Sequence, residues 1–132
     1  MFAETFILLY AAHLTADYPL QTDHQAAHKA GPGRGGWTAN VAHAATHIAA
    51  CGVALLAAVL VLDVEVSVPV AVAALVWIGA THSVIDRRWP IRWWMEHARQ
   101  AGFAEHGGAA HVDQTAHVLA LVVAALTITA AG

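Results

Sequence analysis

The chain has 132 residues, of which 58% are hydrophobic and only 11% are charged. An ordinary soluble domain carries about 25% charged residues, and a soluble fold of this size leaves a large share of its surface in water. The composition therefore predicts one integral membrane domain covering residues 1–132, with membrane lipid as its surroundings. The formal net charge of −3 argues against a nucleic-acid partner, which usually requires a basic face.

Four apolar segments, separated by three polar breaks, predict an all-α fold: a four-helix transmembrane bundle. The expected spans are residues 2–19, 38–62, 68–86 and 113–131. A spanning helix needs about 20 mostly apolar residues, so the first and third segments are marginal, and buried helices of a soluble bundle are the competing interpretation. The first segment has no basic region before its apolar run and contains His13 and Asp17. We therefore expect a retained helix rather than a signal peptide.

The positive charges predict how these helices are oriented. All six basic residues lie in the first and third connections: Lys29 and Arg34, then Arg87, Arg88, Arg92 and Arg99. An up-and-down topology places these two connections on the same side of the membrane. The positive-inside rule makes that side cytoplasmic, with both termini outside.

The two basic connections differ in kind. The first, residues 21–37, contains several glycines, so we expect its second half to be flexible. In the third connection, residues 89–102 predict an amphipathic interfacial helix, whose apolar face includes Ile91, Trp94 and Met95; an ordinary surface helix is the alternative. Four tryptophans fall at this predicted interface, as in an aromatic belt: Trp37, Trp89, Trp93 and Trp94.

Each predicted span carries a pair of ionisable residues at spacing i, i+4. The eight residues are His13, Asp17, His43, His47, His82, Asp86, Asp113 and His117. This spacing places both members of a pair on one helix face, about 6 Å apart along the axis. The pairs end the first and third spans and begin the second and fourth, so all four converge at one level near the cytoplasmic face. Facing helices of a bundle are a known location for metal sites.

We expect the eight side chains to be metal ligands. A metal-free polar or proton-relay network is the alternative, since a single helical histidine is more often a hydrogen-bonded residue than a ligand. Imidazole suits zinc and iron, and carboxylate suits harder ions, so we expect zinc, with iron or manganese as alternatives. A tetrahedral zinc takes four ligands. Eight ligands therefore favour a dinuclear site, with the two ions about 3.5–4 Å apart.

Other polar residues near this level are candidates for contact with a substrate or for additional ligation. The candidate substrate-binding residues are Gln21, Lys29, Arg87 and Arg88. Cations beside a metal site can hold a phosphate, although topology alone also explains the arginines. The additional histidines are His24, His28 and His111, which either join the site or lie solvated in the connections. His97 and His106 are expected to be solvated.

The order of these residues matches a recognisable pattern. It consists of His13-x-x-x-Asp17, Pro19-Leu20-Gln21, Lys29, His43, His47, His82-x-x-x-Asp86 and Asp113-Gln114-x-x-His117. The pattern resembles an uncharacterised bacterial family of small membrane proteins, domain of unknown function 3307. This resemblance implies a place in the bacterial inner membrane, but no activity.

The repeated HxxxD element is more loosely similar to inner-membrane metal-dependent hydrolases. These in turn resemble zinc phospholipase C and single-strand nucleases, which cleave phosphoesters. The tryptophan and glutamate ligands of those enzymes have no counterpart in this sequence, and fold-level analogy does not establish a function.

The expected function is a membrane-embedded metal-dependent hydrolase acting on a phosphoester or phosphoanhydride at the cytoplasmic interface. The substrate would be a phosphate-containing small molecule or a lipid head group. Asp17, Asp86 and Asp113 are the candidate catalytic carboxylates, one of them bridging the ions or acting as a base. A divalent-metal transporter or sensor, a di-iron membrane oxidoreductase and a structural metal clamp are alternatives. The abundance of small residues also favours a homo-oligomer.

Overall fold

The structure is a computed structural model that describes residues 1–131, and every regular element in this range is a helix. The elements are α1 (Phe2–Asp17), α2 (Asp23–His28), α3 (Gly33–Leu62), α4 (Val68–Ile85), α5 (Trp89–His97), α6 (Ala101–Phe103), the short segment η1 (Ala104–Gly108) and α7 (Ala109–Ala131). The predicted all-α fold class is confirmed.

Three helical stretches are long and apolar enough to cross a membrane. They are α3, α4 and the run from Ala101 to Ala131 that ends in α7. The fourth long helix, α1, has 16 residues, fewer than the about 20 that a spanning helix needs. Length and hydropathy therefore indicate a membrane protein with three candidate spanning helices.

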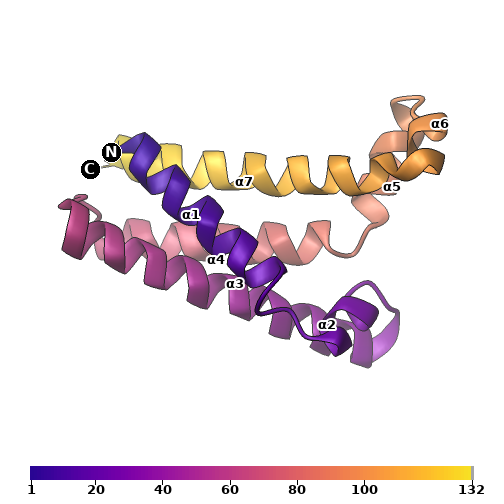
Figure 1. Cartoon of the computed structure of the whole chain (residues 1–132), viewed down its shortest axis with the longest axis horizontal. Coiled ribbons are helices and arrows are strands. Elements are labelled where there is room, and N and C mark those ends of the chain that lie inside the picture. The colour runs from indigo at the N-terminus through magenta and orange to yellow at the C-terminus, as the bar shows by residue number, and fades with distance from the viewer. Residues whose placement is uncertain (132) are drawn as a thin grey trace.

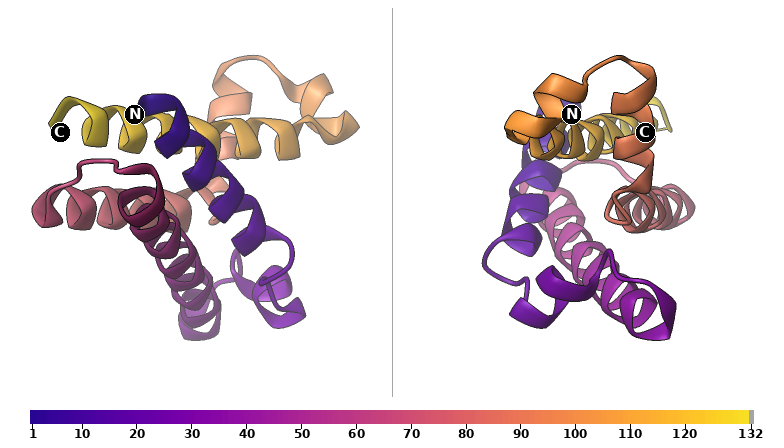
Figure 2. Two further views of the ribbon diagram at one scale, coloured as in Figure 1. Left: turned by 60° about the vertical axis from the view of Figure 1, so that its left-hand side comes forward. Right: turned by 90° about the vertical axis from the view of Figure 1, so that its right-hand side faces the viewer.

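The four long helices run back and forth, so that the two termini lie at one end of the molecule (Figure 1). The connection between α3 and α4 lies at the same end, whereas α2 and α5 lie at the opposite end. α1 packs against α3, and α4 packs against α7. These two pairs cross obliquely and do not run parallel (Figure 2). Both basic connections therefore share one end, as the up-and-down topology predicts.

The helix ends follow local signals in the sequence. At α2, the Thr22 hydroxyl accepts a hydrogen bond from the Gln25 amide, and the Gln25 side chain accepts one from the Thr22 amide, which is a capping box. Pro69 lies in the first turn of α4, where its missing N–H has no partner to lose. Asp63 ends α3 with φ of 53°, a left-handed conformation that Asp tolerates better than most residues.

The second half of the first basic connection, which the sequence predicts to be flexible, is partly helical because α3 begins within it. α3 begins at Gly33, whereas the predicted start is residue 38, and the helix reaches 30 residues. A Cβ atom on Gly36 would lie 1.9 Å from the carbonyl oxygen of Gly31. The glycine therefore allows the first turn of α3 to approach the preceding backbone closely.

The predicted amphipathic helix is present as α5 but ends at His97, before the predicted end at residue 102. Arg99 has φ of 56°, which is incompatible with continuing an α-helix. Ile91 and Met95 are buried, as the predicted apolar face requires, but Trp94 is exposed. The buried face of α5 is therefore narrower than predicted.

An apolar core fills the half of the molecule nearer the termini. Its buried residues include Leu9 of α1, Leu55 of α3, Ile78 of α4 and Leu121 of α7. α3 and α4 approach each other closely at Gly79, where a Cβ atom would lie 2.5 Å from the Cδ1 atom of Ile48. Along all four helices, the ionisable residues follow this core on the side of α2 and α5.

Candidate metal centre

The ionisable residues predicted to converge form a buried layer next to the apolar core. Six of the eight are almost completely buried: His13, His43, His47, His82, Asp86 and His117. The Asp17 side chain is 7% exposed. The i, i+4 spacing places each pair on the inward face of its helix, so seven of the eight predicted ligands are buried in one layer.

Asp17, the last residue of α1, is surrounded by imidazole rings. Its Oδ1 atom lies 3.2 Å from Nε2 of His43, 3.2 Å from Nε2 of His47 and 3.9 Å from Nε2 of His82. Its Oδ2 atom lies 3.2 Å from Nε2 of His13. One carboxylate therefore faces imidazole nitrogens contributed by α1, α3 and α4.

Asp86, the residue directly after α4, provides a second carboxylate. Its Oδ2 atom lies 3.1 Å from Nε2 of His82 and 3.6 Å from Nε2 of His43. Its Oδ1 atom lies 3.0 Å from Nζ of Lys29 and 4.0 Å from Nε2 of His117. Asp86 thus joins the histidines of the buried layer to a cation from the first basic connection.

Two groups of donor atoms are compact enough to hold metal ions, because the atoms of each group lie within 4.8 Å of one another. Group one is Asp17, His43, His47 and His82, and group two is His82, Asp86 and His117. Because the groups share His82, they are neighbouring parts of one cluster. Six of the eight predicted ligands belong to it.

The two remaining predicted ligands, His13 and Asp113, lie outside these groups. His13 contacts the cluster through Asp17, and its ring centroid lies 5.2 Å from that of His117. The Nδ1 atom of His117 lies 3.0 Å from the carbonyl oxygen of Asp113 and 3.4 Å from its Oδ1 atom. Asp113 is therefore placed to fix the His117 ring so that Nε2 points into the cluster.

Three polar atoms of group two have no hydrogen-bond partner among the described residues. They are Nε2 of His82, Nε2 of His117 and Oδ2 of Asp86, and all are fully buried. The 3.1 Å contact between His82 and Asp86 does not have hydrogen-bond geometry. A buried polar atom without a partner costs about 1–3 kcal/mol, so the protein alone leaves group two unsatisfied.

Gln114 was not predicted as a site residue, yet it links α7 to α1. Its Nε2 atom donates to Oδ2 of Asp17 at 3.3 Å, and its Oε1 atom lies 3.5 Å from Nε2 of His13. The Asp113-Gln114-x-x-His117 motif contains this residue, so the signal was present in the sequence. Its role was not apparent because the contact joins helices about a hundred residues apart in the chain.

Asn40 is a second residue that the sequence analysis missed. It is completely buried, and its side chain donates to the carbonyl oxygen of Ser83 at 3.0 Å and accepts from the Ser83 hydroxyl. Asn40 precedes His43 by three residues and His47 by seven, a spacing that places all three on one face of α3. It thereby fixes the histidine face of α3 against α4.

The predicted substrate-binding residues separate into two sets. Arg87 donates to the carbonyl oxygens of Lys29 at 2.9 Å and Gly31 at 2.7 Å. Its guanidinium also lies 4.4 Å from the ring centroid of Trp37. The Arg87 side chain, which follows α4, therefore binds the backbone of the turn between α2 and α3.

The other three, Gln21, Lys29 and Arg88, line two adjoining cavities that we call the vestibule. The cavities have volumes of about 290 and 440 Å³, and Gln21, Lys29, Asp86 and Asp113 border both. The smaller cavity reaches Asp17, and the larger is bordered by Arg88 and the N-terminal residues of α7. The vestibule thus connects the carboxylates of the cluster to the basic end of the molecule.

The additional histidines do not belong to either group. His24 and His28 are exposed on α2 and stack on each other with ring centroids 4.5 Å apart. His97, His106 and His111 are also exposed. Their positions agree with the expectation of solvated residues in the connections.

Comparison with known proteins identifies a family. The family model described as "Protein of unknown function (DUF3307)" covers residues 5–132, which include every residue of both donor groups. No curated protein and no solved structure matches the chain. The motif-based recognition of the family is therefore confirmed, and the chain belongs to the DUF3307 family.

Proposed function

We propose that the chain is a membrane-embedded, metal-dependent hydrolase. Its buried cluster binds two divalent ions, with zinc preferred, and it cleaves a phosphoester or phosphoanhydride at the cytoplasmic interface. The observation that carries the proposal is the arrangement around Asp17, where one carboxylate oxygen faces the Nε2 atoms of His43, His47 and His82.

The distances around Asp17 match those between neighbouring ligands of a zinc ion. Ligand atoms at about 2.0–2.1 Å from a tetrahedral zinc lie about 3.3 Å from one another. The contacts of Asp17 with His43 and His47 are both 3.2 Å. The same two contacts also have hydrogen-bond geometry, at the long end of the usual range of about 2.7–3.2 Å. An ion shared by these side chains would fit the same spacing.

Because His82 belongs to both donor groups, we assign it to the second ion, which gives two sets of three ligands. Asp17, His43 and His47 would hold one ion, and His82, Asp86 and His117 would hold the other. The second ion would satisfy the three buried polar atoms that lack partners. Catalytic zinc sites typically have three protein ligands and an open position, so this division favours catalysis over a closed structural site. Iron and manganese are accommodated by the same donors.

Ions held by these residues would supply a nucleophile at neutral pH, because a divalent ion lowers the pKa of a bound water to about 7. In hydrolysis, the water oxygen bonds to phosphorus, the bond from phosphorus to the leaving oxygen breaks, and that oxygen takes up a proton. Asp113, 24% exposed in the vestibule, would accept the proton that the water releases and pass it to the leaving oxygen. Lys29 and Arg88 hold the remaining phosphoryl oxygens.

The proposal includes a four-helix transmembrane bundle in the bacterial inner membrane. α1 is the fourth span, because it packs against both α3 and α7 and contributes two buried site residues. Its 16 residues extend about 24 Å, which requires some local thinning of the bilayer. The basic end that carries Lys29 and Arg88 then faces the cytoplasm, with both termini outside.

The alternatives receive less support. A transporter needs polar groups across the full membrane, but the cluster is followed by the apolar core around Leu55 and Leu121. On the terminal side of that core, the buried polar groups among residues 1–131 are the hydroxyls of Thr5 and Thr129. No specific observation favours a di-iron oxidoreductase or a structural clamp.

Elemental analysis combined with a phosphatase assay tests the proposal. We expect about two equivalents of zinc in detergent-purified protein and hydrolysis of p-nitrophenyl phosphate. His47→Ala should lose metal and activity, Asp113→Ala should lose activity while retaining most of the metal, and the exposed control His97→Ala should change neither. Absence of metal from the wild-type protein would refute the proposal, and iron with a visible charge-transfer band would replace it with the oxidoreductase.

A further inference from the structure

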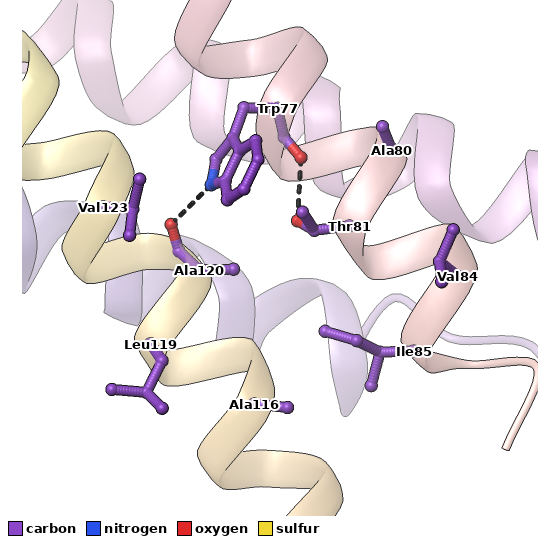
Figure 3. Close-up of a pocket in the computed structure, with 9 residues that line it drawn as sticks. All are labelled: Trp77, Ala80, Thr81, Val84, Ile85, Ala116, Leu119, Ala120 and Val123. Atoms are coloured by element: carbon purple, nitrogen blue, oxygen red, sulfur yellow. Dashed lines mark hydrogen bonds between the residues drawn. The ribbon is translucent and has the colours of Figure 1, made fainter. Parts of the chain in front are cut away.

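An apolar groove of about 440 Å³ lies between α4 and α7 on the outside of the helices (Figure 3). Ala80 and Ala116 leave space between the two helices, and Leu119 and Val123 form part of the wall. The indole Nε1 of Trp77 donates to the carbonyl oxygen of Ala120 at 2.9 Å, so the ring bridges the helices at one end of the groove.

The groove continues the vestibule along the same helix faces. On α7, residues 109 and 113 border the vestibule, and residues 116, 120 and 123 border the groove. Their spacing of four and three residues defines one stripe along a helix. On α4, Trp77, Thr81 and Ile85 border the groove, and Arg88 beyond the helix borders the vestibule. The two spaces therefore follow each other, one in the apolar span and one at its polar end.

The groove also lies next to the metal centre. Thr81 and Ala120 border the groove on one side, and on the other they border a small cavity lined by His82 and His117. A molecule that occupies the groove is thus separated from group two by a single layer of side chains.

Together, the polar vestibule and the apolar groove suit an amphiphilic ligand. The vestibule is lined by charges of both signs, with Lys29, Arg88 and Arg92 next to the carboxylates of the cluster, whereas the groove is lined almost entirely by carbon. Between Ile85 and Trp77, eight residues of helix give an apolar length of about 12 Å. A phosphate group held by Arg88 and Arg92 in the vestibule, with a hydrocarbon chain in the groove, matches both the cations at the polar end and the apolar length.

We propose that the groove between α4 and α7 binds the hydrocarbon tail of a phosphate-bearing lipid whose head group lies in the vestibule. This inference rests on the proposed function, because the phosphate in the vestibule is then the reacting group. It narrows the substrate to a membrane lipid and assigns the groove a role in orienting that lipid.

Photo-crosslinking tests this assignment without requiring turnover. Protein purified in dodecyl maltoside, a detergent without phosphate, receives phosphatidic acid with a diazirine on its acyl chain, or diacylglycerol with the same chain. We expect crosslinks at Trp77, Leu119 and Val123 with phosphatidic acid, and far fewer with diacylglycerol, which lacks the phosphate.

The variant Ala80→Phe fills the groove from the exposed side of α4, so it should not disturb the core. We expect crosslinking in the groove to fall about tenfold, the loss that corresponds to displacing roughly two buried methylene groups. Ala49→Phe, the same substitution on an exposed position of α3, should leave the yield unchanged. Crosslinks that are equal for both lipids, or that persist in Ala80→Phe, would overturn the assignment.

Metal content separates this result from a failure of the proposed function. If zinc-loaded protein hydrolyses p-nitrophenyl phosphate but shows no head-group-dependent crosslinks, lipid binding in the groove is refuted and the hydrolase proposal stands. Head-group-dependent crosslinks in protein that binds no metal support lipid binding and refute the hydrolase.

Discussion

Replacing Asp17 with asparagine should disable the metal centre while preserving the shape of the side chain. In the wild-type protein, Oδ1 faces His43 and His47 at 3.2 Å, and Oδ2 faces His13 at 3.2 Å. An asparagine amide turned either way places an NH₂ group against one of these sets of imidazoles. The negative charge that balances the bound cation is lost as well.

The expected loss of metal affinity is larger than the loss caused by removing a residue that only supports a ligand. Removing a group that only supports a ligand costs about 10–100-fold in metal affinity. Asp17 is itself a proposed ligand, so Asp17→Asn should weaken binding of at least one zinc by about 100-fold or more, which is about 2.7 kcal/mol. Competition with a fluorescent zinc chelator measures this affinity in detergent.

The matched control is Asp63→Asn, at the opposite end of α3. Asp63 has a left-handed conformation, which asparagine also tolerates, so the fold should be kept and zinc affinity unchanged. If Asp17→Asn binds two zinc ions as tightly as wild type, Asp17 is not a ligand and the account of the cluster is refuted.

Three further predictions concern stability. Arg87→Ala removes two hydrogen bonds to the turn before α3 and should lower the free energy of unfolding by about 1–3 kcal/mol, with the zinc content unchanged. Loss of zinc in this variant would instead show that Arg87 supports the metal centre. Asn40→Ala leaves Ser83 without its partner and should destabilise by a similar ~1–3 kcal/mol in thermal unfolding, whereas an unchanged midpoint would show that this contact does not hold α3 to α4. Removing metal with EDTA should lower the midpoint of thermal unfolding, and added zinc should restore it, because a ligand at 100 times its Kd stabilises the folded state by about 2.7 kcal/mol. An identical midpoint with and without the chelator would mean that no ion is bound.

The convergence of the ionisable pairs could be predicted because it depends only on helix geometry and topology. Spacing of i, i+4 fixes the face, and alternation of the basic connections fixes which helix ends meet. His43, His82 and Asp86 lie together for these reasons. Neither argument needs knowledge of side-chain packing.

The finer arrangement could not be predicted, because it depends on contacts between helices. Asp113 has the same spacing as the other carboxylates, yet it lies beside Nδ1 of His117 and outside both donor groups. Arg87 and Arg88 are adjacent in the sequence, but Arg87 binds backbone carbonyls and Arg88 borders the vestibule. The early start of α3 at Gly33 depends on the contact between Gly36 and Gly31, which local sequence patterns do not reveal.

X-ray absorption spectroscopy at the zinc edge tests the central claim most directly. For zinc-loaded wild-type protein, we predict a first shell of nitrogen and oxygen at about 2.0–2.2 Å and a zinc–zinc distance of about 3.5–4 Å. Both should disappear together in a variant that lacks His47 and His82. A first shell of water oxygens alone, or a spectrum unchanged in that variant, would contradict a metal centre built from these buried side chains.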